Sequence, residues 1–188
     1  MKNKSKKGDT SQSVASSHIE PVPQGGHYTM EDSGTKLYIR AIHDLTVIKV
    51  DDGIVITKDE GFKKCDFLCE VRSKKCVHLF ELKRGKMDDA FLQLERTPQA
   101  IQEHSDYKNI LDGLDRLDAY IVSPLKQRVP DNLDERQRKL CKKLATYCNA
   151  PVGNIMNLLK LVKVDPLCKR LMEKEGRIIC SHRYPLEL

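Results

Sequence analysis

The chain has 188 residues, enough for one domain with tails, and 32% of them are charged, with a net charge of +6 and a pI near 8.9. This basic excess is compatible with a polyanionic partner, but the absence of tryptophan and the 5% aromatic content argue against an aromatic stacking platform for nucleic acid. No run of about 18 apolar residues occurs, so we expect no membrane span. Seven cysteines without a secretory signal favour a reduced, cytoplasmic protein.

The N-terminal third begins with a polar segment and continues with short apolar runs. Residues 1–26 are rich in Ser, Lys, Gln and Gly, which predicts a disordered basic tail. Apolar runs at 37–40 and 45–50 predict strands. Asp51-Asp52-Gly53 is a strong turn signal before a further apolar run at 54–56, so a turn explains these aspartates better than metal binding.

The next two apolar runs carry the charged residues of interest. Residues 65–71 and 76–82 are separated by a short polar break, which predicts a β-hairpin. A two-residue loop at 73–74 would place Asp66 directly opposite Glu81. Because both faces of the hairpin are otherwise apolar, we expect a central strand pair with a covering layer on each side.

Lys83 lies two residues beyond Glu81 and would therefore share its face of the sheet. Two carboxylates at the edge of a sheet cost free energy unless a cation compensates them. Mg²⁺, or Mn²⁺ in its place, suits such a site, because Mg²⁺ takes one or two protein carboxylates with water and phosphate oxygens. Asp66 and Glu81 are therefore candidate metal ligands, and the Lys83 ammonium is a candidate catalytic group. An ordinary cross-strand salt-bridge cluster is the competing interpretation.

An amphipathic helix is predicted after this hairpin. Asp88 or Asp89 is a candidate N-cap, and Gln93 lies on the flank toward the charged edge, with a plain surface glutamine as the alternative. Thr97-Pro98 predicts either a kink or the start of a new helix. Helical apolar spacing predicts that the following residues face the sheet: Met87, Ala90, Phe91 and Leu94.

The order Asp66, Glu81-x-Lys83 and a helix carrying Gln93 resembles the PD-(D/E)XK nuclease superfamily, the fold of many restriction enzymes and Holliday-junction resolvases. The resemblance covers about residues 45–125 and includes the strings FELK and AFLQL. It implies that Asp66 and Glu81 bind metal, that Lys83 is catalytic and that Gln93 assists the site.

The sequence departs from the family pattern in one place and leaves another position open. Lys64-Cys65 stands where the name-giving Pro would precede the first aspartate. The acidic residue that this family usually takes from an upstream helix has two candidates, Glu31 and Glu20.

The C-terminal half is predicted to be mainly helical after one strand. The run at 118–123 follows a helix-like segment at 107–116, an order that suggests a crossover to a parallel strand. Helices are predicted at 134–148 and 152–162, and a third from Asp165-Pro166 to before Gly176. The first of these helices has a basic face that either contacts a nucleic-acid backbone or is simply solvated; the candidate residues are Arg136, Lys139, Lys142 and Lys143.

Together these features predict an α/β fold, with a mixed central β-sheet flanked by helices in a restriction-endonuclease-like core. We expect a tail at 1–26, a nuclease core at 27–130 and a helical C-terminal extension at 131–188. The expected activity is that of a divalent-metal-dependent endonuclease that hydrolyses phosphodiester bonds in DNA, with a homodimer plausible in this family. The alternatives are a nucleic-acid-binding protein that does not cleave, and a structural or partner-binding subunit on the same fold.

Overall fold

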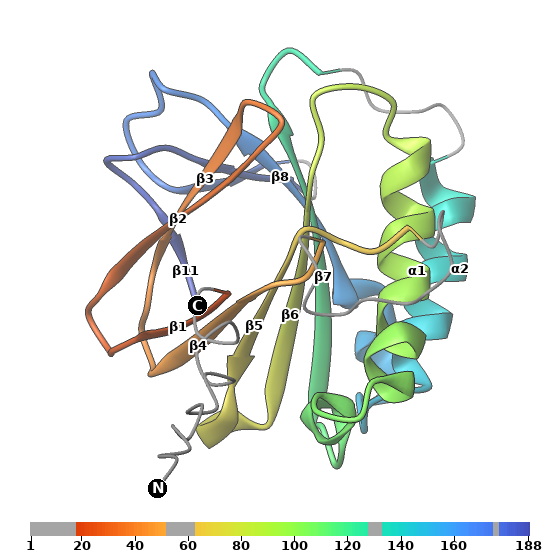
Figure 1. Cartoon of the computed structure of the whole chain (residues 1–188). Helices are drawn as coiled ribbons and strands as arrows, with labels where there is room; N and C mark the ends of the chain where they lie inside the picture. The colour runs from red at the N-terminus through yellow and green to blue at the C-terminus, as the bar shows by residue number, and fades with distance from the viewer. Residues whose placement is uncertain (1–17, 52–62, 128–132, 175–176) are drawn as a thin grey trace, which may run out of the picture.

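A computed structural model describes residues 18–51, 63–127, 133–174 and 177–188. Its centre is a mixed eight-stranded sheet in the order β1-β4-β5-β6-β7-β8-β10-β9, beside a three-stranded sheet in the order β11-β3-β2 (Figure 1). The central strands are β1 (Ile19–Val22), β4 (Leu45–Lys49), β5 (Phe67–Val71), β6 (Cys76–Leu82), β7 (Arg116–Pro124), β8 (Leu159–Val164), β10 (Arg177–Cys180) and β9 (Met172–Lys174). The smaller sheet contains β2 (His27–Asp32), β3 (Thr35–Arg40) and β11 (Leu186–Glu187). The predicted α/β class with a mixed central sheet is confirmed.

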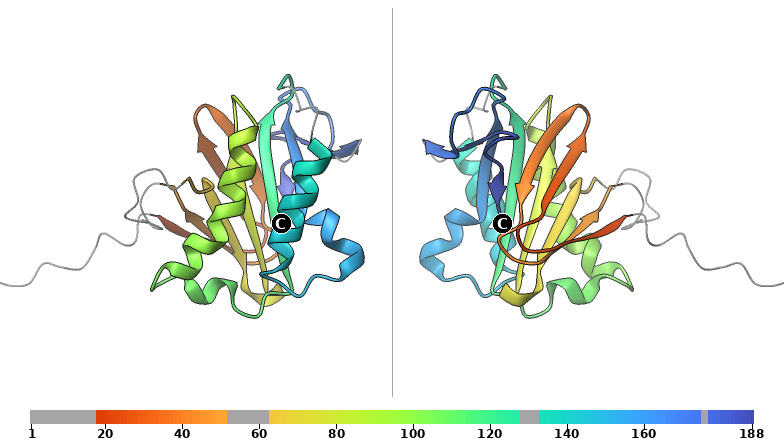
Figure 2. Two further views of the ribbon diagram at one scale, coloured as in Figure 1. Left: turned by 90° about the vertical axis from the view of Figure 1, so that its right-hand side faces the viewer. Right: turned by 90° about the vertical axis from the view of Figure 1, so that its left-hand side faces the viewer.

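The central sheet is covered on both faces, as its apolar pattern predicts. Helices α1 (Asp88–Glu103) and α2 (Leu133–Ala145) lie side by side on one face, and the β2–β3 hairpin lies over the other (Figure 2). Successive side chains of a strand point to opposite faces, so Leu79 and Ile121 pack toward the helices while Phe80 and Val122 pack toward the smaller sheet. The described part of the chain therefore has two hydrophobic cores, separated by the central sheet.

The register of the β5–β6 hairpin agrees with the prediction, although its loop differs. Phe67 pairs with Phe80. Asp66 and Glu81, the next residues away from the hairpin loop, therefore lie opposite each other. The loop has four residues rather than two: the short helix η1 (Arg72–Lys74) is followed by Lys75 in the left-handed conformation, with φ of 47°. Ser-Lys is a poor sequence for a tight two-residue turn, and the longer loop preserves the same register.

Two crossover connections build the parallel half of the sheet. Strand β6 runs parallel to β7 and β7 runs parallel to β8, with α1 and α2 making the connections. The predicted strand at 118–123 and its parallel crossover are therefore confirmed. The carboxyl ends of β6 and β7 consequently meet at one edge, and Lys83 N–H donates to Val122 O there at 2.7 Å.

Several predicted elements are wrong. The expected helix at 152–162 is the short helix η3 (Val152–Leu158) followed by β8, and the expected third helix gives way to a turn and β9. Among the described residues after 130, α2 and η3 are helical, whereas β8 and β10 join the central sheet. Short apolar runs suit strands as well as helices, and only pairing with β7 selects the strand.

The N-terminal half and α1 also differ from the predictions. Strand β1 lies inside the segment predicted to be a tail, and Asp88 and Asp89 occupy the first turn of α1 without capping it. The helix continues through Pro98 rather than ending there. The strand predicted at 54–56, together with Asp52 and Gly53, lies outside the described residues. Within the described ranges, no helix combines the length and apolar character needed to span a bilayer.

The core between the sheet and the helices makes a direct stability prediction. Leu79 is fully buried in it, so Leu79→Ala should lower the free energy of unfolding by about 2–5 kcal/mol in urea denaturation. Leu167→Ala is the matched control, because Leu167 is 85% exposed and its truncation should cost less than about 0.5 kcal/mol. Equal losses in the two variants would contradict this packing.

Candidate active site

Two carboxyl groups are buried across the β5–β6 pair, on the face that the helices cover. Asp66 is 4% exposed and Glu81 is 0% exposed. Asp66 Oδ2 accepts a hydrogen bond of 2.6 Å from Leu82 N–H. Neither carboxylate oxygen of Glu81 accepts a hydrogen bond from the residues that the structure describes. A buried acceptor without a donor is costly, so the contact of Glu81 with a cation matters for its stability.

Lys83 completes the predicted trio. Its Nζ lies 2.5 Å from Glu81 Oε1, in an ion pair. The Lys83 side chain is 22% exposed, so it links the buried carboxylates to solvent. The structure therefore brings together the three residues that the sequence pattern selected.

Burial controls the protonation of this cluster. It raises the pKa of Asp66 to about 7, against the lowering effect of the hydrogen bond from Leu82 N–H. Burial, together with the charge of Asp66, raises the pKa of Glu81 to about 8, although Lys83 acts in the opposite direction. Burial would lower the pKa of Lys83, but its ion pair with Glu81 raises it. One ammonium therefore does not compensate both carboxylates.

Three further acidic residues in the described part of the chain contribute to the electrostatics of the cluster. The charge of Asp32, at the end of β2, raises the pKa of Asp66. The charge of Asp51 raises the pKa of both Asp66 and Glu81, because Asp51 directly follows Val50, whose N–H donates to Asp66 O. Asp89 on α1 acts on Lys83 and pairs with Lys63 at 3.0 Å.

The structure explains why Asp51 escaped prediction. Its sequence context, Asp-Asp-Gly, indicates a turn, and its place beside Asp66 depends on β4 pairing with β5. The spacing of the charged residues along the chain does not predict that β4 pairs with β5.

Of the two candidates for an upstream acid, Glu31 pairs with Lys36 at 2.9 Å and is half exposed, and Glu20 lies exposed on the edge strand β1.

Gln93 is buried and holds the backbone next to Asp66. Its Nε2 donates to Lys64 O at 2.8 Å. Thr97, one turn later, accepts from Cys65 N–H at 2.8 Å and donates its hydroxyl to Gln93 O at 2.7 Å. Helix α1 thus holds both the carbonyl and the N–H of the Lys64–Cys65 peptide unit, just before Asp66. A positioning role for Gln93 follows from these contacts, which differ from those of a surface glutamine.

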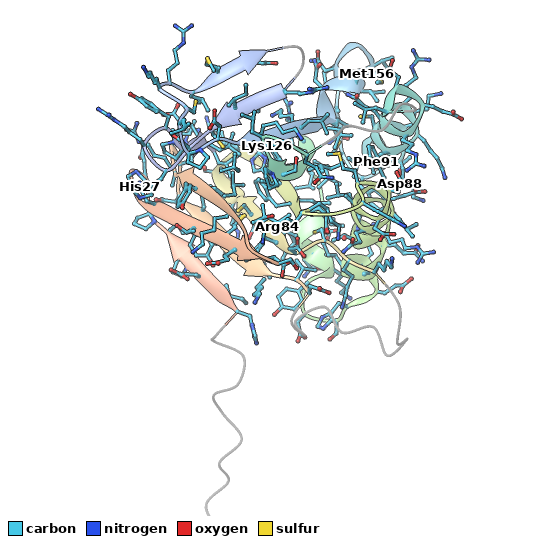
Figure 3. The ribbon with its side chains drawn as sticks, turned by 90° about the horizontal axis from the view of Figure 1, so that it is seen from above. His27, Arg84, Asp88, Phe91, Lys126 and Met156 are labelled. Atoms are coloured by element: carbon cyan, nitrogen blue, oxygen red, sulfur yellow. The ribbon has the colours of Figure 1, made fainter. Side chains whose placement is uncertain are left out.

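A basic loop connects β6 to α1 beside the carboxylates. It has the sequence Lys83-Arg84-Gly85-Lys86, and the side chains of Arg84 and Lys86 are exposed. Gln127, from the loop after β7, donates to Gly85 O at 2.7 Å. Figure 3 looks onto this end of the molecule, with Arg84 near the centre, Asp88 toward the helices and His27 toward the smaller sheet.

The basic face of α2 is partly neutralised by α1. Arg136 forms an ion pair with Asp88, and Lys139 lies 3.8 Å from Glu95. The other two residues selected from the sequence, Lys142 and Lys143, are exposed, and Lys143 lies over the Tyr147 ring. Side-by-side packing of the helices causes this neutralisation, which the sequence of α2 does not indicate.

The donor set of the cluster fits a hard divalent cation. Carboxylate oxygens are the ligands that Mg²⁺ favours, and it commonly binds through one or two of them with water and phosphate. Among the described residues, no group of three or more His, Cys, Asp or Glu side chains is placed to hold a metal ion. Asp66 and Glu81 would therefore be the protein ligands, with solvent or substrate completing the coordination.

Comparisons with protein-family models, with curated proteins and with solved structures find no significant match. Function must therefore be inferred from the chemistry of the site, because a fold class alone does not specify an activity.

The raised carboxyl pKa values predict a pH dependence of stability without metal. In the unfolded chain Asp66 and Glu81 ionise near pH 4, but in the folded protein near pH 7 and 8. Between about pH 4 and pH 8 the folded state binds more protons than the unfolded state. The free energy of unfolding therefore falls as the pH rises through this range. In chelator, Glu81→Gln should be more stable than the parent at pH 8.5, by on the order of 1–3 kcal/mol, with a smaller difference at pH 4.5.

The measurement is urea denaturation at both pH values. Glu135→Gln is the control, because Glu135 is exposed on α2 and should shift stability little at either pH. A Glu81→Gln variant that is less stable than the parent at pH 8.5 would instead favour the salt-bridge interpretation.

The contacts of Gln93 predict a local effect. Gln93→Met keeps the side-chain length but removes the donor to Lys64 O, so the free energy of unfolding should fall by about 1 kcal/mol. Amide hydrogen exchange should accelerate around residues 64–66. Gln99→Met, on the exposed side of the same helix, should leave that exchange unchanged.

Proposed function

We propose that this protein is a divalent-metal-dependent nuclease of the PD-(D/E)XK type that hydrolyses phosphodiester bonds in DNA. Asp66 and Glu81 would hold Mg²⁺ or Mn²⁺, and Lys83 would act on the reacting phosphate. The observation that carries the proposal is the environment of Glu81: a fully buried carboxylate that contacts the Lys83 ammonium and lies opposite a second buried carboxylate.

The electrostatic balance favours a cation over a purely structural salt bridge. A structural salt bridge pairs its charges, and a buried carboxylate left without compensation is strongly unfavourable. Here the ammonium of Lys83 contacts Glu81, while Asp66 accepts a hydrogen bond from the backbone N–H of Leu82. A divalent cation between the two carboxylates would supply the missing positive charge, and it would lower both raised pKa values.

Each residue of the site has a separate role in the proposed reaction. The bound ion would supply Lewis-acid polarisation of a phosphate oxygen. Lys83 stays protonated because the ion pair with Glu81 raises its pKa, so it donates hydrogen bonds to a phosphate oxygen or an attacking water. The N–H of Leu82 fixes Asp66, and Gln93 and Thr97 fix the backbone in front of it.

Charges around the site suit a polyanionic substrate. Arg84 and Lys86 lie in the loop that directly follows Lys83 and are exposed, and exposed cations of this kind bind phosphates without reading sequence. Lys142 and Lys143 on α2 offer a further pair, whereas Arg136 and Lys139 already have acidic partners on α1.

The proposed function predicts that the protein binds a divalent metal. Isothermal calorimetry with Mg²⁺ and with Mn²⁺ should show saturable binding to the parent and none to Asp66→Ala/Glu81→Ala. The reason is that both carboxylate ligands are lost in the double variant. Metal should also raise the melting temperature of the parent, since a ligand that binds only the folded state stabilises it. Equal binding by the parent and the double variant would place the ion elsewhere.

The proposed function also predicts that the protein cleaves DNA with the help of Lys83. Lys83→Ala should retain the fold and lose about 100-fold or more in cleavage of duplex DNA with Mn²⁺, the usual scale for a group acting in the transition state. Lys169→Ala, which removes an exposed lysine far along the chain, is the control. Purified Lys83→Ala that cuts as well as the parent would refute the mechanism. DNA binding that weakens with salt, without product under either metal, would identify a protein that binds DNA but does not cleave it.

A further inference from the structure

The face of the central sheet opposite the carboxylate pair carries a second polar cluster. Asp118 on β7 is paired in register with His78 on β6, and its side chain is only 3% exposed. Two cations contact it: Arg116 Nε lies 2.6 Å from Oδ1, and Lys160 Nζ lies 3.2 Å from Oδ2. His78 Nδ1 lies 3.6 Å from Oδ2, which is longer than a hydrogen bond. The cluster thus gathers two cations and a histidine around one buried acid.

Asp118 is ionised in this setting. Burial by itself would raise its pKa, but the contacts with His78, Lys160 and Arg116 outweigh burial and lower the pKa to about 2. The carboxylate therefore acts as a fixed internal anion that orients two cationic side chains. Such an anchor is needed to hold two like charges close together.

The cations retain donors that Asp118 does not use. An ammonium group has three hydrogens, and Lys160 donates to Asp118 and to the Tyr120 hydroxyl, at 3.1 Å for the latter. Arg116 donates Nε to Asp118 and Nη2 to Asn157 O at 3.4 Å, and within the described structure its Nη1 makes no hydrogen bond. Arginine presents its donors as a planar fork that matches the oxygens of a phosphate.

An open cavity of about 250 Å³ adjoins these groups, between the central sheet and the end of the smaller one. Lys74 also lines it, is exposed, and forms no ion pair within the described part of the chain. The acids that line it are Asp118 and Glu187, and Glu187 has its own partner, Arg40, at 3.3 Å. The cavity volume is about eight times the ~30 Å³ share of a water molecule in the liquid, which suffices for a phosphate group with part of the molecule that it esterifies.

Positive charge is therefore in excess around this cavity. Lys74, Arg116 and Lys160 contribute three permanent cations, and Asp118 compensates one of them. We propose that this cavity is a binding site for a phosphate oxyanion, either inorganic phosphate or the phosphate of a small monoester, held by Arg116, Lys160 and Lys74. The site lies on the sheet face opposite Asp66 and Glu81, so it is independent of the proposed nuclease chemistry.

Calorimetric titration of the full chain with inorganic phosphate and with phenyl phosphate tests the proposal. Chelator excludes binding through a metal at Asp66, and NaCl keeps the ionic strength constant so that general screening does not contribute. The parent should bind at least one of the two saturably. Tighter binding of phenyl phosphate would identify a monoester as the ligand, and tighter binding of phosphate would identify the free anion.

Substitutions locate the site. Lys160→Gln and Arg116→Gln should each weaken binding about tenfold or more, since each removes a charge-assisted hydrogen bond. Lys169→Gln, the same change at an exposed lysine that does not line the cavity, should leave it unchanged. Lys74→Gln alters only an exposed side chain, so it keeps the test decisive if the other variants do not fold, and it should weaken binding about threefold. No saturable binding by the parent, or unchanged binding in folded variants of the cavity residues, would overturn the proposal.

Asp118→Asn separates a ligand site from a purely structural network. Loss of the internal anion should lower the melting temperature without phosphate, because two cations then face each other. Under the proposal, added phosphate replaces the lost charge and recovers a large part of that decrease. A purely structural network would show the same decrease with no recovery, and that result would also overturn the proposal.

Discussion

The rest of the candidate site depends on the burial of two carboxyl groups opposite each other on β5 and β6. Their proximity follows from hairpin register, and their burial follows from packing of α1 over the same face. Among the described residues, Asp66 accepts a hydrogen bond from one backbone N–H and Glu81 contacts the Lys83 ammonium, so the contacts named here set one cation against two carboxylates. A fold that retains such a pair pays for it in stability, and a cation is the simplest compensation.

Helix α1 supports this arrangement with polar contacts as well as with the apolar side chains that it packs against the sheet. Gln93 and Thr97 hydrogen-bond to the single Lys64–Cys65 peptide unit just before Asp66, so the helix that covers the hydrophobic core also helps to position one carboxylate. The same helix offers Asp88 and Glu95 to the basic residues of α2. The positive charge that stays available near the site therefore lies mainly in the loop after β6, where Arg84 and Lys86 follow Lys83.

Strand β6 has opposite electrostatic character on its two faces. Glu81 points toward the helices, where it lies opposite Asp66 and contacts Lys83, whereas His78, three residues earlier, points toward the smaller sheet, where Arg116 and Lys160 contact Asp118. Alternation along a strand makes this separation possible, because adjacent positions face different layers. The sheet backbone and its apolar side chains keep the two clusters apart, so each retains its own charge balance.

The sequence by itself determined the α/β class, the β5–β6 register and the trio Asp66, Glu81 and Lys83, because alternation and spacing are local properties of a strand pair. Only the tertiary structure decided that residues 159–164 form a strand, that Asp51 lies beside Asp66, and that α1 neutralises part of α2. It also decided that Arg116, Asp118 and Lys160 meet in one cluster. Each of these outcomes depends on which elements pair or pack together, and residues far apart in the chain carry no local pattern that specifies such contacts.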